Sequence, residues 1–136
     1  MSDSSLQVLN TVLDRLSHTL LQYIGESWPW TDPLDPAQHE TVLGLVRRQQ
    51  FGAERVAELL TERRAIVTLG NYPFDGTMLH YCTVAFVKPK LIADESQLIA
   101  ELKQALADVD GDSEAIRLLE QLIADEEDTV SKLEEL

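Results

Sequence analysis

The sequence predicts an all-α protein, a four-helix bundle formed by one domain that spans residues 1–136. Apolar residues recur at three- and four-residue spacing in four long stretches, which is the pattern of amphipathic helices. One long connection, residues 65–76, separates the second stretch from the third, as in bundles that contain a long crossover. The length suits a single domain, and no repeat of fixed period is visible.

The first helix is predicted from about Ser4 to Gly25, because a serine can cap its start and a glycine can end it. Its apolar stripe consists of Leu6, Leu9, Leu13, Leu16, Leu20, Tyr23 and Ile24. Residues 26–36 contain three prolines and cannot be helical throughout. We interpret Trp28 and Trp30 in this segment as a cover over one end of the core.

The second helix is predicted to begin after Asp35, a good N-cap with Pro36 at the first helical position, and to extend to about Arg64. Its stripe is apolar at both ends but polar or small in the middle, at Gln49 and Gly52. A small-molecule pocket beside the glycine is one possibility that this gap leaves open.

The third helix is predicted to start within residues 74–77 and to end near Asp108, after a loop over residues 65–76. Pro89 must kink or divide it, because a proline inside a helix removes a hydrogen bond and crowds the preceding turn. If Pro89 ended the helix outright, the fold would be a five-helix array. Glu95 falls within the apolar stripe beyond this proline.

The fourth helix is predicted over Ser113–Leu136, with Ser113 as its N-cap after a turn at Gly111. Its apolar stripe consists of Ile116, Leu119, Leu122, Ile123, Val130 and Leu133. Glu126 lies on the same stripe. A carboxylate there is costly unless it is protonated, paired or bound to a metal.

Three interpretations of Glu95 and Glu126 remain open. The two carboxylates can point to solvent or pair with a basic side chain, for which the candidates are Arg47, Arg48 and Lys103. They can instead form a buried cluster that shares a proton or an arginine. They can also be what remains of a metal site.

The composition excludes two classes of partner. The net charge is −13 and the pI is near 4.4, whereas nucleic acids and anionic membranes require positive charge. No apolar run is long enough to cross a membrane, and the N-terminus lacks a signal peptide, so we expect a cytoplasmic protein. Cys82 is the only cysteine, and its apolar surroundings suggest a buried, inert thiol.

None of the three histidines is a strong candidate for a metal ligand. His18 lies off the first apolar stripe and is expected to be exposed, and His39 lies in the first turn of the second helix, where we expect it at the surface. His80 is interpreted as a structural histidine near the start of the third helix.

Three segments together resemble the bacterioferritin and rubrerythrin type of ferritin-like four-helix bundle. Residues 9–13 read Leu-Asn-x-Val-Leu, with Gln22-Tyr23 following on the same helix; residues 53–58 read Ala-Glu-Arg-Val-x-Glu; and residues 119–128 end in Asp-Glu-Glu-Asp. The resemblance covers the first, second and fourth helices, roughly half of the chain. It implies a bundle with one long crossover and a di-iron centre in its core.

The ligand set that the resemblance implies is largely missing. Leu16 stands where the first helix of the family places its glutamate. Gln49 and Gly52 replace the Glu-x-x-His pair of the second helix, and Glu126 is followed by Thr129 where the fourth helix has histidine. Both imidazoles and two charges are therefore absent, and the resemblance implies a degenerate di-iron site.

We predict a non-catalytic binding, interaction or structural protein that forms a homodimer through helix faces and can have an unknown protein partner. The remnant metal positions are Glu95, Glu126 and, as a poor third, Gln49. The alternative is an iron- or manganese-binding oxidoreductase or iron-handling protein with a carboxylate-rich site. No catalytic residue and no other cofactor is predicted.

Overall fold

The computed structural model describes residues 3–27, 36–72 and 84–136, and within these ranges the only regular elements are helices. They are α1 (Asp3–Ser17), α2 (Leu20–Ser27), α3 (Pro36–Glu62), α4 (Val84–Asp108) and α5 (Ser113–Glu134). The predicted all-α class is confirmed. No helix in the described part is long and apolar enough to cross a membrane.

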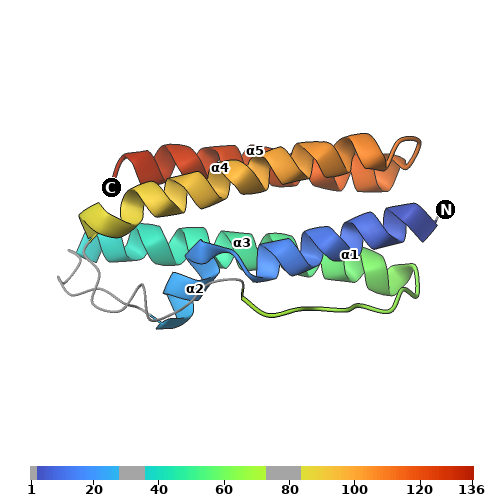
Figure 1. The fold of residues 1–136 in the computed structure, drawn as a ribbon, viewed down its shortest axis with the longest axis horizontal. Coiled ribbons are helices and arrows are strands. Elements are labelled where there is room, and N and C mark those ends of the chain that lie inside the picture. Colours follow the sequence, from blue (N-terminus) through green and yellow to red (C-terminus); the bar gives the residue numbers. More distant parts are fainter. Residues whose placement is uncertain (1–2, 28–35, 73–83) are drawn as a thin grey trace.

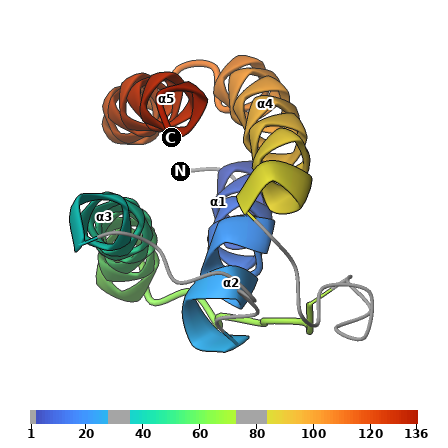
Figure 2. The same cartoon turned by 90° about the vertical axis from the view of Figure 1, so that its left-hand side faces the viewer.

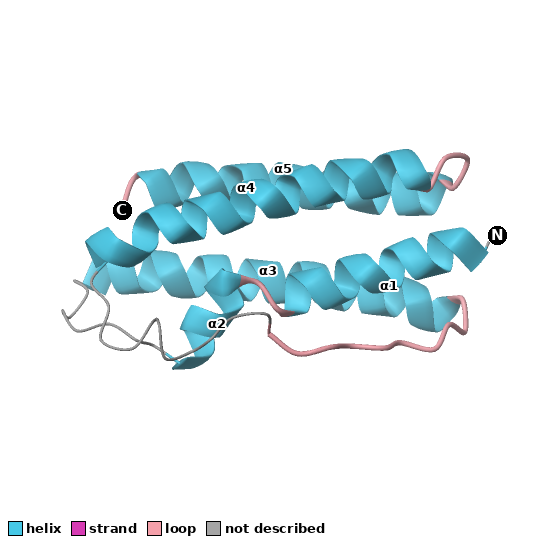
Figure 3. Ribbon diagram, viewed as in Figure 1, coloured by secondary structure: helices cyan, strands magenta, loops and turns pink. Residues whose placement is uncertain are grey.

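The four long helices lie alongside one another, and the short α2 follows α1 at a bend (Figure 1). The most extensive contacts pair α4 with α5 and α1 with α3. The members of each pair run in opposite directions, and the end view places the two pairs in separate layers (Figure 2). The connection after α3 returns along the length of the molecule before α4 begins (Figure 3).

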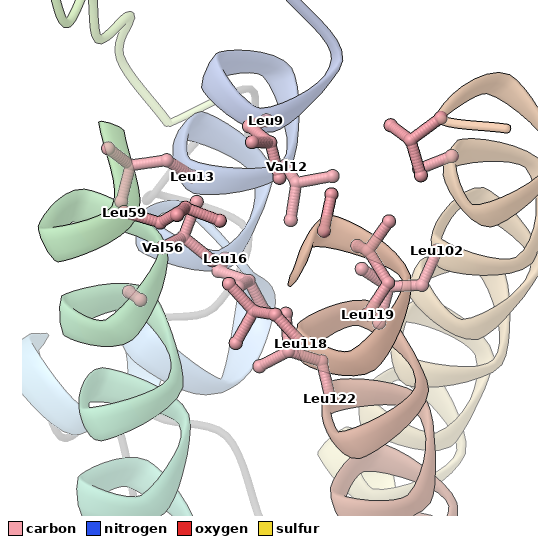
Figure 4. Packing of buried hydrophobic residues seen from close by; sticks show 14 of the residues in the cluster. Leu9, Val12, Leu13, Leu16, Val56, Leu59, Leu102, Leu118, Leu119 and Leu122 are labelled. Carbon is pink, nitrogen blue, oxygen red and sulfur yellow. The ribbon is translucent and has the colours of Figure 1, made fainter. Parts of the chain in front are cut away.

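The apolar core consists of two clusters. The larger is formed by residues from α1, α3, α4 and α5, and leucines from several helices point toward one another there (Figure 4). The smaller is formed by α2, the first half of α3, the start of α4 and the end of α5. Gln49, Glu95 and Glu126 fall between the two clusters along their helices, so a polar layer separates the two apolar parts of the core.

The predicted first helix is not continuous, because it breaks at His18 and Thr19. The Thr19 hydroxyl accepts a hydrogen bond from the Gln22 backbone N–H at 3.0 Å, which is N-capping geometry. The backbone N–H of Leu20 donates to Asp94 Oδ2 on α4 at 2.9 Å. These two acceptors give hydrogen-bond partners to backbone N–H groups in the first turn of a new helix. The expectation of one helix from Ser4 to Gly25 was therefore wrong.

The other helices agree more closely with the sequence. The second predicted helix is α3. The third is α4, which continues through Pro89, so the proline does not divide it and the condition for a five-helix array through a stop at Pro89 is not met. The expected start of that helix lies outside the described residues, as do Trp28, Trp30, His80 and Cys82. The N-cap of α5 is Asp112 rather than Ser113, since the Asp112 side chain accepts from the backbone N–H of Ala115.

The connection after α3 has no regular secondary structure over residues 65–72, as predicted for a loop. It begins after Arg64, whose positive φ of 57° ends the helix. Its described part ends at Tyr72, whose ring makes edge contacts with His18 and Tyr23. His18 is therefore partly covered rather than exposed, whereas His39 is exposed, as expected.

Candidate functional site: a buried layer of carboxyl and amide groups

The structure brings together the three residues that the sequence nominated. Glu95 on α4 is 0% exposed, Gln49 on α3 is 2% exposed and Glu126 on α5 is 3% exposed. Gln49 Nε2 donates to Glu95 Oε1 at 2.8 Å. The same nitrogen lies 3.2 and 3.1 Å from the two carboxyl oxygens of Glu126. One amide group therefore bridges two buried carboxyl groups from different helices.

The orientation of the Gln49 amide is determined by groups on the opposite side. Its oxygen accepts a hydrogen bond from the Thr19 hydroxyl at 2.5 Å and another from Gln22 Nε2 at 3.1 Å. Gln22 Nε2 also donates to the backbone carbonyl of Val46 at 2.9 Å. Because two donors face the oxygen, the NH₂ group must face the carboxyl groups, and a flipped amide would lose the hydrogen bonds on both sides.

Sequence reasoning missed Thr19 and Gln22 as members of this layer. Both are buried, and they reach Gln49 from the break between α1 and α2 and from the first turn of α2. The sequence carries little signal for this, because Leu16 and Leu20 keep the four-residue spacing of the apolar stripe across the polar residues Ser17, His18 and Thr19.

Neither buried carboxyl group forms a salt bridge within the described part of the chain. Arg48, a candidate partner in the sequence, instead pairs with Asp128 at 2.7 Å. Its other nitrogen donates to Thr129 Oγ1 at 2.7 Å and to the carbonyl of Asp125 at 2.9 Å. The interpretation of Glu95 and Glu126 as solvent-facing or paired with a basic side chain was therefore wrong.

The proton-sharing interpretation agrees with the geometry. Burial raises the pKa of Glu95 well above its ordinary value, and the hydrogen bond and negative charge of Glu126 raise it further, while the Gln49 hydrogen bond opposes them. Glu95 Oε2 is buried and accepts no hydrogen bond in the described part of the chain. A proton on Glu95 would give its carboxyl group a donor for Glu126, so the raised pKa and the unpaired oxygen both favour a proton shared between the two side chains.

The other positions at which the resemblance implies di-iron ligands, Leu16, Gly52 and Thr129, leave no open space beside the carboxyl and amide layer. Leu16 is buried in the larger apolar cluster, as its place in the stripe predicts. A Cβ atom on Gly52 would lie 2.9 Å from Leu122 Cδ2, so the leucine already occupies the space and the pocket suggested beside this glycine is not there. Thr129 is buried, and its hydroxyl donates to the carbonyl of Asp125 at 3.0 Å.

The donor set does not fit the di-iron centre that the resemblance implies. Such a centre uses four carboxylates and two imidazoles, and no group of three His, Cys, Asp or Glu side chains with metal-binding geometry occurs among the described residues. Gln49 presents N–H groups, not its oxygen, to Glu95 and Glu126. A cation between the carboxyl groups would face those hydrogens, so the arrangement fits a proton and does not fit iron or manganese.

Comparisons with known proteins identify no relative: no protein-family model, no curated protein and no solved structure matches this chain.

Proposed function

We propose that this protein is a non-catalytic, ferritin-like helical bundle that acts as a binding or interaction module, with hydrogen bonds and a shared proton in place of a di-iron centre. Gln49 carries the proposal, because its amide donates to both carboxyl groups and its oxygen is satisfied by Thr19 and Gln22. The order of the helices supports the ferritin-like part, since two antiparallel pairs are joined by one long connection (Figure 1).

The buried layer of carboxyl and amide groups can serve a purely structural role, which is to fix how the helices align. It connects α2, α3, α4 and α5 at one level through side chains that can be satisfied in only one register. A slip of any helix would leave a buried amide or carboxyl group without a partner, at a cost of about 1–3 kcal/mol for each neutral group and more for a charge. The layer therefore specifies the alignment of the bundle while the apolar clusters stabilise it.

A metal titration tests the proposal. Protein purified without chelators is analysed for iron and manganese, and then titrated with each ion while binding heat and released protons are measured. We expect no stoichiometric uptake by the native chain, and no difference between it and Glu126→Ala.

The matched control is Glu120→Ala, which removes an exposed carboxylate from the same helix. Stoichiometric iron or manganese that is lost in Glu126→Ala and retained in Glu120→Ala would overturn the proposal. That result would favour the alternative, a carboxylate-rich metal protein.

A further inference from the structure

A groove of about 740 Å³ lies between α1 and α4. The two helices run side by side in opposite directions, so the start of α1 is beside the end of α4 (Figure 1, Figure 2). The apolar residues that line the groove are Val8, Val12, Leu98, Leu102 and Ala105. They belong to the larger apolar cluster or pack against it, so the floor of the groove lies directly over the core. A groove of this volume with an apolar floor is typical of a small-molecule site.

One end of the groove is closed by an ion-paired arginine that reaches from α1 to α4. Arg15 Nε donates to Glu101 Oε2 at 2.6 Å. Arg15 Nη2 donates to Asp94 Oδ1 at 3.0 Å and to the backbone carbonyl of Asp94 at 3.2 Å. Among the described residues that line the groove, Arg15 is the one that carries a positive charge, and two carboxylates already neutralise it.

The two other charged residues of the lining, Asp14 and Asp108, are both acidic. Asp14 Oδ1 accepts from the backbone N–H of Gly70 at 2.7 Å and lies 3.1 Å from His18 Nδ1, so this carboxylate is engaged with groups beside the groove. Asp108 ends α4 at the opposite end of the groove from Arg15. It is exposed, accepts from the neutral amide of Gln104 at 3.2 Å, and forms no ion pair within the described part of the chain.

This distribution of charge and apolar surface selects the chemistry of the ligand. An anion would lie between carboxylates without a cation to receive it, because the guanidinium of Arg15 is already paired. An ammonium group beside Asp108 would form a charge-assisted hydrogen bond, and an attached apolar chain would displace water from the floor. Glu101 and Asp108 are two helical turns apart on α4, about 10 Å, which is similar to the length of an extended octyl chain.

We infer that the groove between α1 and α4 binds a small amphiphilic cation, with its ammonium group beside Asp108 and its apolar chain on the floor toward Arg15. The inference rests on the binding role proposed above and gives that role a class of ligand. It needs the groove but not the carboxyl and amide layer. The metal titration tests the layer and a ligand titration tests the groove, so the failure of one can be distinguished from the failure of the other.

Calorimetric titration with three ligands that share an octyl chain tests the charge preference. Octylammonium, octanol and octanoate are each titrated below the concentration at which they aggregate, and a basic amphipathic peptide is titrated in parallel. We expect one saturable site for octylammonium, with an affinity at least tenfold higher than for octanol or octanoate. Equal affinities for the three head groups would overturn the inference, as would a groove that binds the peptide but not octylammonium.

Two pairs of variants locate the site. Asp108→Asn should weaken octylammonium binding at least fivefold, whereas Asp110→Asn, which changes an exposed carboxylate outside the lining, should not. An equal loss in both would show attraction to the net negative charge alone and would overturn the inference.

The second pair tests the floor. Val8→Trp should fill the groove and abolish binding, whereas Ala107→Trp, at an exposed position of α4 outside the lining, should leave it unchanged. Circular dichroism checks that the helices are kept, and Thr11→Trp, at an exposed position on the rim, replaces Val8→Trp if that variant does not fold. Binding that survives the tryptophan in a folded variant would contradict the assignment to this groove.

Discussion

Replacing Glu95 with glutamine mimics the protonated form of this side chain and removes its ability to titrate. Glutamine has the shape of a protonated glutamate. Its oxygen can accept from Gln49 Nε2, as Glu95 Oε1 does at 2.8 Å, and its NH₂ group can donate to Glu126. The variant therefore keeps the hydrogen bonds of the layer but needs no proton to fold.

The sign of the effect follows from the pKa of Glu95, which is raised in the folded state above its ordinary value of 4.5 by burial and by Glu126. The folded protein then binds a proton that the unfolded chain releases, so this contribution to stability is complete below about pH 4.5 and is lost as the pH rises toward the folded pKa. Each pH unit between the unfolded and the folded pKa corresponds to about 1.4 kcal/mol.

The assay is urea unfolding followed by circular dichroism between pH 4.5 and 7.5. We expect Glu95→Gln to have a higher free energy of unfolding than the native chain above pH 5, with an advantage that grows by up to about 1.4 kcal/mol per pH unit. Glu120→Gln, an exposed carboxylate on α5, is the control and should stay within about 0.5 kcal/mol of the native chain. Parallel pH profiles for Glu95→Gln and the native chain would refute the shared proton.

Two further substitutions test other parts of the account by the same urea unfolding assay, which is extended to about pH 2.5 for Asp112→Asn. Gln49→Leu leaves Thr19, Gln22 and both carboxyl groups without their shared partner, and should lower the free energy of unfolding by at least about 3 kcal/mol; a loss below about 1 kcal/mol would contradict the network. Asp112→Asn removes a bidentate pair with the buried Arg63 and should cost about 2 kcal/mol at pH 7. Because Arg63 lowers the pKa of Asp112, that cost should shrink as the pH falls below about 3.8, and a cost independent of pH would contradict it.

The sequence predicted the long helices well because their signal is local. Each apolar stripe repeats over several turns, and Pro36 and Gly111 mark boundaries whose backbone requirements do not depend on the rest of the fold. The break at His18 and Thr19 was different. It depends on Asp94, a residue on α4 that accepts from the Leu20 N–H, and no periodicity within the first helix reveals an acceptor from another helix.

The sequence was enough to predict which residues form the candidate site, but not whether they hold a proton, an ion pair or a metal. Glu95, Glu126 and Gln49 stood out because each is a polar residue on an apolar stripe, and three such interruptions at one level of a bundle must meet. The raised pKa of Glu95 comes from its burial and from the proximity of Glu126 on another helix, and the direction of the Gln49 amide between them is determined by Thr19 and Gln22 at the α1–α2 break. That information is tertiary, so the sequence left the proton, the ion pair and the metal as alternatives.

Infrared spectroscopy of the native chain over a pH series tests the central claim most directly, because a protonated carboxyl group has a C=O stretching band that carboxylates lack. The raised pKa of Glu95 predicts that one such band, shifted in D₂O, persists in native protein and in Glu120→Gln after the exposed carboxyl groups have ionised with rising pH, and that it is absent in Glu95→Gln. A native spectrum that loses this band together with the exposed carboxyl groups would contradict the account, since Glu95 would then titrate as an ordinary carboxyl group.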